Sequence, residues 1–203
     1  MCLIKTFSIP LFFIVSLTAF SAGLEINNLP FPKNTLDKIK KHEIITESVV
    51  TDYEAKDKNK RQTMDFKSAG LHKKTCAESI PRIFNYESYQ DKIEMITHSS
   101  YNDALGRIKI ILTAPIIKHS FGLNFKIPRI TQPGSFDFLF DSGFLSGLKG
   151  TITVTPINKH CLYYAQASWD GPHSGYSNLI LSLFSKTAMA LSTNKLFRIS
   201  GSY

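Results

Sequence analysis

The chain has 203 residues, a formal net charge of +8, and an aromatic content of 12% that includes 15 phenylalanines. This length is enough for one domain with a sizeable hydrophobic core. The basic residues are dispersed rather than gathered in a stripe with exposed aromatic side chains, which argues against a nucleic-acid-binding protein. The net positive charge instead favours contact with an anionic membrane surface.

The first 24 residues have the composition of a secretory signal peptide. Lys5 is their one charge before the apolar run Ile9–Leu17, and the small residues Ala19 and Ser21 precede a cut before Ala22. A membrane anchor is the alternative, but the apolar run is well short of the roughly 20 residues that span a bilayer. We therefore expect export to the periplasm or the cell exterior, with a formal charge of +7 after Lys5 is lost.

Cleavage would divide the chain into residues 1–21 as signal peptide, 22–42 as an N-terminal arm with a short helix, and 43–203 as the folded domain. It also removes Cys2 and leaves Cys76 and Cys161. An even pair of cysteines in an exported chain favours a disulfide over a redox or metal site. Two buried free thiols are the alternative.

The first half of the mature chain mixes short helices with two strands. Residues 27–33 predict an extended arm, 35–42 a short helix, and 43–53 and 63–71 two strands rich in β-branched residues. The charged stretch 56–61 between the strands predicts a solvated hairpin tip, with an anion site as the alternative.

A helix follows these two strands. Thr75 and Glu78 have the spacing of a capping box, in which Thr75 caps the helix and Glu78 reaches back to its backbone. Pro81 in the next turn predicts a kink or the start of a second short helix.

The second half of the chain alternates apolar and polar residues. In residues 107–113, for example, Ile108, Ile110 and Leu112 share one face, which is typical of a strand with one buried side. Short links between such segments predict consecutive antiparallel strands. The six predicted strands are residues 92–101, 107–113, 119–127, 135–141, 149–156 and 161–169.

The segment 174–198 predicts one long helix with a broad apolar face, capped by Ser174.

This order of elements resembles that of the START-like superfamily, which includes lipid-transfer START domains, plant allergen-type proteins, polyketide cyclases and aromatases, and coenzyme-Q-binding proteins. The resemblance covers residues 62–198. It is most useful in residues 77–100 (AESIPRIFNYESYQDKIEMITHSS), which are similar to the helix-to-strand passage of cyclase-like members. Residues 143–145 (GFL) and 147–150 (GLKG) resemble the hairpin before the last two strands.

The resemblance implies an α+β helix-grip fold, in which a curved antiparallel sheet wraps around a long C-terminal helix, with short helices after the first strands. It also implies that the 63–71 strand pairs with the last strand, which would bring Cys76 beside Cys161. A lipocalin-type barrel is the alternative fold, although such barrels lack a helical insertion after the first strand.

The family resemblance further implies a cavity between the sheet and the C-terminal helix that takes apolar ligands. Apolar walls with a few polar groups suit a small-molecule pocket. Phenylalanines packed into a solid core are the alternative. The residues expected to line the cavity are Phe121, Phe125, Phe136 and Phe138 from the strands, Leu179 and Leu183 from the helix, and Tyr164 and Gln166 as polar groups on the last strand.

No residue set predicts catalysis, a metal site or a cofactor. No two of the six histidines stand at the local spacing of a helix or strand metal site. Ser142 and Ser146 are interpreted as turn residues, because neither lies in a nucleophile elbow. Asp137 and Asp141 are interpreted as part of a solvated strand face. The sequence therefore predicts a binder of an apolar or lipid-like small molecule. A cyclase- or aromatase-like enzyme and a cavity-free interaction module are the alternatives.

Overall fold

The computed structural model describes residues 24–114, 117–143, 145–179, 181–182, 185–186 and 194–198, with the backbone alone at 114, 117–119 and 121. The predicted signal peptide, Phe144 and Leu183 lie outside the described residues.

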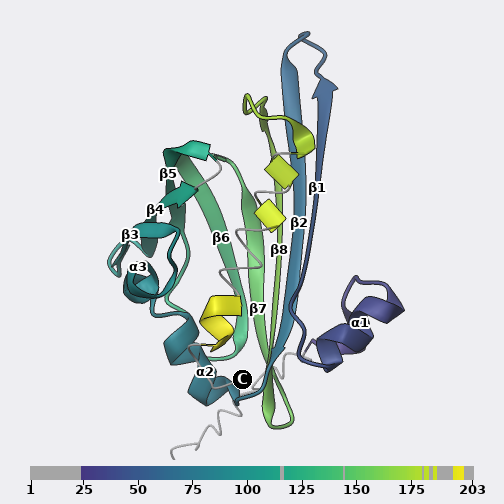
Figure 1. Ribbon diagram of the computed structural model, residues 1–203, viewed down its shortest axis with the longest axis vertical. Coiled ribbons are helices and arrows are strands. Elements are labelled where there is room, and N and C mark those ends of the chain that lie inside the picture. Colours follow the sequence, from purple (N-terminus) through teal and green to yellow (C-terminus); the bar gives the residue numbers. More distant parts are fainter. Residues whose placement is uncertain are drawn as a thin grey trace, which may run out of the picture.

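The described chain forms one eight-stranded antiparallel sheet flanked by helices (Figure 1). The strand order across the sheet is β1-β2-β8-β7-β6-β5-β4-β3, so that the second and the last strands are neighbours. The elements in chain order are η1 (Ile26–Asn28), α1 (Lys33–Lys40), β1 (Ile45–Glu54), β2 (Lys60–His72), α2 (Cys76–Ile83), η2 (Tyr86–Ser88), α3 (Tyr89–Lys92), β3 (Ile96–Asn102), β4 (Arg107–Ala114), β5 (Ile117–Lys126), β6 (Gly134–Gly143), β7 (Lys149–Ile157) and β8 (His160–Pro172).

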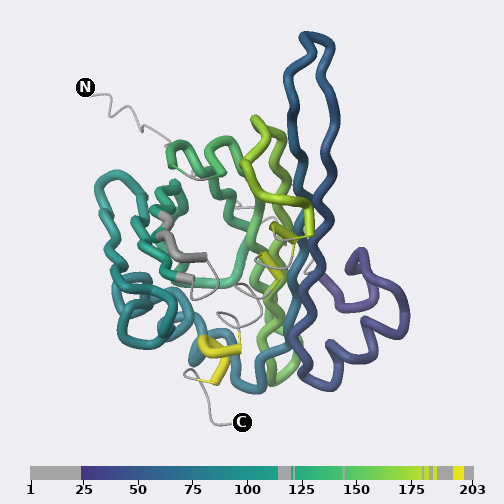
Figure 2. The backbone as a smooth tube through the Cα atoms, turned by 45° about the horizontal axis from the view of Figure 1, so that its top comes forward, coloured from purple at the N-terminus to yellow at the C-terminus, as the bar shows by residue number. Residues whose placement is uncertain are grey.

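The C-terminal segment is helical at residues 178–179, 181–182, 185–186 and 194–198. Figures 1 and 2 show these residues along one face of the sheet, between β1–β2 on one side and β3–β5 on the other. We call this face of the sheet the inner face and the opposite one the outer face. A curved antiparallel sheet that carries a C-terminal helix on its inner face confirms the predicted helix-grip fold class. No helix among the described residues is long and apolar enough to cross a membrane.

The C-terminal helix begins later than the sequence predicts. Gly175 has a φ of +85°, which interrupts the helical backbone after Ser174. The Ser174 hydroxyl donates to Gln62 Oε1 at 2.6 Å and accepts from the Tyr176 N–H at 3.3 Å. The first described helical residue is therefore Asn178, and Ser174 anchors the preceding turn to β2 instead of capping the helix.

The pairing of β2 with β8 runs from Arg61↔Pro172 to His72↔Cys161 and closes the sheet between the two halves of the chain. This confirms the predicted neighbourhood of the two cysteines. Cys76, in the first turn of α2, forms a disulfide with Cys161, with their Cα atoms 4.8 Å apart.

The short helices differ in detail from their predictions. The capping box of Thr75 and Glu78 is present. Helix α2 continues through Pro81 to Ile83, so no second helix starts there. Strand β3 begins only at Ile96, because the predicted strand residues before it include the short helix α3.

The N-terminal arm packs on the outer face of the sheet. Its apolar side chains contact the outward side chains of β2 and β8 at the end of the sheet where α1 lies. The arm is therefore part of the packed structure and not a free extended lead-in. The cluster consists of Leu29, Phe31, Leu36 and Ile39 from the arm and Ala69, Leu71, Leu162 and Tyr164 from the sheet.

Candidate ligand-binding site

The inner face is built by alternation along the strands, which the register carries across the sheet apart from irregularities in the pairs β3–β4, β4–β5 and β5–β6. On β7 and β8, for instance, Ile152 lies opposite Ala165 and Val154 opposite Tyr163, all on the inner face. The predicted inward residues Ile108, Ile110 and Leu112 of β4 are buried in the same core.

Aromatic rings from β5 and β6 form a cluster on this face. Phe125 stacks on Phe140 with ring centroids 4.4 Å apart, and Phe138 packs edge-on against both rings. Phe125, Phe136, Phe138 and the neighbouring Ile152 are only partly buried, although they lie on the face that carries the helix. The middle of the inner face is therefore apolar and still reachable by solvent.

The sheet is open beside this cluster. Strands β5 and β6 pair only from Leu123↔Gly143 to Lys126↔Leu139, and the described partners of residues 134–138 of β6 are on β7 alone. The chain after β5 leaves the sheet and turns Ile127 and Ile130 into the core. Arg129 in this segment forms ion pairs with Glu87 and Asp103, which fix it to the helical region.

Polar side chains tie the start of the C-terminal helix to β1 and β2. Gln62 is fully buried, and its amide donates to Asn178 Oδ1 at 2.8 Å and Asp52 Oδ1 at 3.0 Å. Ser185 donates to the Ser48 hydroxyl at 2.7 Å. Every buried side-chain nitrogen and oxygen in the described part of the chain has a hydrogen-bond partner. These groups therefore hold the helix in place over the apolar face.

The far end of the inner face is closed by aromatic packing. Phe197 packs edge-on against Tyr163 and His72, with centroids 5.3 and 5.1 Å away. The Tyr163 hydroxyl lies 2.6 Å from Ser79 Oγ. Since Ser79 donates to the Thr75 carbonyl, Tyr163 is the donor of this bond. Burial raises the pKa of Tyr163 well above its usual value, so this tyrosine is a neutral, fixed part of the closed end.

His72 is the buried histidine of this end, and its two ring nitrogens have fixed roles. The Lys74 N–H donates to Nδ1 at 2.9 Å, and Nε2 lies 3.2 Å from the Phe197 carbonyl. Nε2 therefore carries the proton and the ring is neutral. Burial lowers the pKa of His72 below the ordinary value of 6.5.

Protonation of His72 predicts a pH dependence of stability. Below pH 6.5 the unfolded chain takes up a proton at this position that the folded protein does not. The free energy of unfolding is therefore unaffected by His72 above that pH and falls as the pH decreases, by at most about 1.4 kcal/mol per pH unit. In urea titrations from pH 7.5 to 5, His72→Asn is expected to show a shallower pH dependence than the unmodified protein. Equal slopes for the two proteins would contradict the assignment.

The structure changes the predicted set of site residues. Tyr164 and Gln166 lie on the outer face, because the alternation that turns Cys161 and Tyr163 inward turns their neighbours outward. The Leu179 side chain is 78% exposed and does not line the inner face. The side chain of Phe121 and the whole of Leu183 lie outside the described residues.

Residues that the sequence reasoning missed include Ile152, Tyr163 and Phe140 on the inner face. Alternation with their strand neighbours was the available signal for Ile152 and Phe140.

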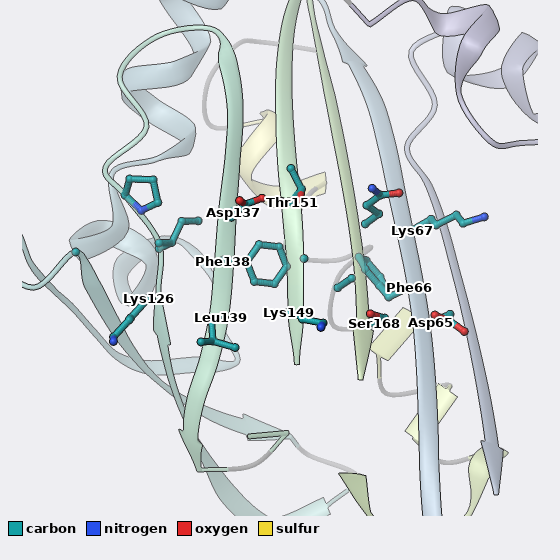
Figure 3. A pocket seen from close by; sticks show the side chains of 16 residues that line it. Asp65, Phe66, Lys67, Lys126, Asp137, Phe138, Leu139, Lys149, Thr151 and Ser168 are labelled. Carbon is teal, nitrogen blue, oxygen red and sulfur yellow. Dashed lines mark hydrogen bonds between the residues drawn. The ribbon is translucent and has the colours of Figure 1, made fainter. Parts of the chain in front are cut away.

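The outer face carries a groove of about 760 Å³ (Figure 3). It runs across five strands, from Lys126 on β5 at one end to Lys67 on β2 at the other. Outward side chains such as Asp137 and Thr151, which are hydrogen-bonded to each other, form its sides. None of the described helix residues lines it. Its lining also includes Phe66 and Phe138 of the inner face.

The residues weighed for catalysis have structural partners. Asp137 accepts from Thr151, and Asp141 pairs with Arg107, so the two carboxylates are not a pair. The Ser146 carbonyl accepts from the Trp169 indole at 2.9 Å in the turn before β7. Among the described residues, no group of three or more histidines, cysteines or carboxylates lies close enough to hold a metal ion.

No family model matches the sequence, and no curated protein matches it. Solved structures do match. The di-domain ARO/CYC protein StfQ from the steffimycin biosynthetic pathway aligns with a TM-score of 0.53 and 9% identity, over 67% of this chain and 48% of that one. A START superfamily protein from Mycobacterium smegmatis aligns with a TM-score of 0.52 and 8% identity, over 66% of this chain and 96% of that one. The chain has a START-like fold.

A STAR-related lipid transfer protein from Xanthomonas axonopodis agrees with this START-like fold, with a TM-score of 0.51 and 9% identity over 75% of this chain and 98% of that one. The predicted resemblance of residues 62–198 to START-like proteins is thus confirmed at the level of fold. At such identities a shared fold carries no shared ligand or reaction.

Proposed function

We propose that this START-like protein binds an apolar or lipid-like molecule between the inner face of its sheet and the C-terminal helix. The observation that carries the proposal is the incomplete burial of Phe125, Phe136, Phe138 and Ile152 on the face that the helix crosses. A face that is apolar, concave and still reachable by solvent is what a small hydrophobic ligand requires.

The structure favours binding over the two alternatives. A solid core would bury these aromatic rings as completely as it buries Ile108 and Val154 on the same face. An enzyme of the cyclase or aromatase kind needs an acid–base pair in the cavity. The polar groups described there, Gln62, Ser48 and Ser185, are instead engaged in holding the helix.

Export and membrane contact are the finer parts of the proposal. A disulfide between Cys76 and Cys161 suits an oxidising compartment, which supports export after cleavage before Ala22. N-terminal sequencing that finds Met1 retained in the cellular protein would contradict this part. The tip of the β1–β2 hairpin presents the exposed Lys56, Lys58 and Lys60, which suits attraction to an anionic bilayer.

Extraction of a fluorescent fatty acid or phospholipid from vesicles tests the binding function. Replacing Ile152 by tryptophan places a bulky indole ring in the middle of the inner face, and we expect it to abolish extraction while the protein stays folded. Overpacking of a filled core would instead destabilise the protein by about 1–3 kcal/mol. The unfolding midpoint measured beside the extraction distinguishes the two results.

Leu139→Trp is the matched control, because Leu139 is exposed on the outer face of β6 next to Phe138. It should extract lipid as the unmodified protein does. Faster extraction from anionic than from zwitterionic vesicles would support membrane contact. If the unmodified protein extracts none of the lipids at any vesicle charge, the binding proposal is wrong.

A further inference from the structure

Two histidine rings meet at the edge of the sheet where helix α1 and the turn between β7 and β8 lie. His42 follows helix α1, and His160 is the first residue of β8. Their ring centroids are 4.9 Å apart with an interplanar angle of 70°. Both side chains are partly exposed. No local sequence pattern predicts this pair, because only the tertiary structure brings the two residues together.

Backbone carbonyls fix the tautomer of both rings in the same way. His42 Nδ1 lies 2.8 Å from the Leu71 carbonyl oxygen, and His160 Nδ1 lies 3.1 Å from the Lys73 carbonyl oxygen. A carbonyl only accepts, so each Nδ1 carries the proton and donates. Each Nε2 is then left with a lone pair. A histidine that donates one ring nitrogen to a backbone carbonyl and offers the other as a lone pair is the usual form of a metal ligand in proteins.

The spacing of the rings suits one shared metal ion. With a metal–nitrogen bond of about 2.0–2.1 Å, an imidazole centroid lies about 3.2 Å from the ion. Two centroids 4.9 Å apart then subtend about 100° at the metal, close to the angle of tetrahedral coordination.

The backbone at His42 ends helix α1. Its φ is +67°, in the left-handed region that glycine or asparagine usually occupies after a helix. The His42 N–H donates to the Ile39 carbonyl and the Glu43 N–H to the Lys38 carbonyl, which completes the helix termination around this residue. Histidine is one of the residues enriched in this conformation, which therefore ends α1 and sets the place from which the His42 ring projects.

We propose that His42 and His160 bind one divalent transition-metal ion, such as Zn²⁺ or Cu²⁺, through their Nε2 atoms. Imidazole is a preferred ligand of both ions. Because the described residues contain no group of three or more potential ligands, two protein nitrogens hold the ion and water or an external ligand completes its coordination. A hollow of about 690 Å³ adjoins the His42 ring, and its other lining residues are Glu43, Ile44, Asn194 and Arg198.

A bound ion would connect the end of α1 to the start of β8. It would therefore fasten the N-terminal arm to the sheet at the same edge where Cys161 is joined to α2. The histidine pair shares no residue with the aromatic cluster of the inner face, so a failure to bind zinc and a failure to bind lipid are distinguishable results.

Calorimetric titration of the full chain with zinc chloride at pH 7.5 tests the site. We expect one Zn²⁺ per chain, and about tenfold or more weaker binding in both His42→Asn and His160→Asn, since loss of a direct ligand should matter at least as much as loss of an outer-shell partner. Asparagine tolerates the left-handed conformation of residue 42, so this variant keeps the helix end. Zinc should also raise the melting temperature of the unmodified protein and not that of the two variants.

His98→Asn and His173→Asn are the matched controls, since His98 is exposed on β3 and His173 lies beside Asp52 at the other end of the sheet. Both should bind zinc as the unmodified protein does. Urea unfolding without zinc establishes that each variant is folded. Absence of zinc binding to the unmodified protein, or binding that persists in His42→Asn and His160→Asn, would overturn the proposal.

Discussion

Replacing Cys76 and Cys161 together by alanine is expected to lower the free energy of unfolding by about 4 kcal/mol in the chain-entropy account of disulfides. The bridge closes a loop whose ends are 85 residues apart, and a loop this long restricts the unfolded chain strongly. Both cysteines are buried, so the loss of two sulfur atoms from the core adds to the effect. Urea unfolding of the oxidised protein and of the double variant gives the difference directly.

A reducing agent provides the control for this prediction. Dithiothreitol should lower the unfolding midpoint of the unmodified protein towards that of the double variant and leave the variant unchanged. Two free thiols titrated in the denatured, unreduced protein would refute the bridge between Cys76 and Cys161.

Truncation of Phe197 to alanine is expected to destabilise the protein by about 3–5 kcal/mol. Its ring is 1% exposed and occupies the space over Gly70, where an added Cβ would lie 2.8 Å from the ring. It also packs against His72 and Tyr163, so its removal opens a cavity where the helix end meets the sheet. Thermal and urea unfolding measure the loss.

Leu179→Ala on the same helix is the control for Phe197→Ala. Because Leu179 is exposed, its truncation should change the free energy of unfolding by no more than about 0.5 kcal/mol. If the two variants lose comparable amounts of unfolding free energy, Phe197 is not the main attachment of the C-terminal helix to the sheet.

The sequence was a good guide wherever one physical pattern decided the structure. The alternation of Ile108, Ile110 and Leu112 identified β4 and its buried side, and the spacing of Thr75 and Glu78 identified the start of α2. The disulfide followed from the order of the elements, because the fold resemblance placed β2 beside β8.

The sequence was ambiguous where both faces of a strand are covered. Residues 161–164 of β8 are all hydrophobic, because α2 covers one face of the strand and the N-terminal arm covers the other. Alternation therefore does not predict on which face Tyr164 lies, and the prediction that it lies on the inner face was wrong. The contact of His42 with His160 has no local signature at all, because it depends on how the arm packs against the sheet.

The strand order has a consequence for the timing of folding during synthesis. Strand β2 has two partners, β1 and β8, and β8 lies about a hundred residues further along the chain. The β1–β2 hairpin can form early. Strand β2 and the N-terminal arm, however, lack their main contacts until the ribosome has made residues 160–172 of β8. Because contacts so distant in sequence form slowly, the chain should remain without its native sheet until synthesis is nearly complete.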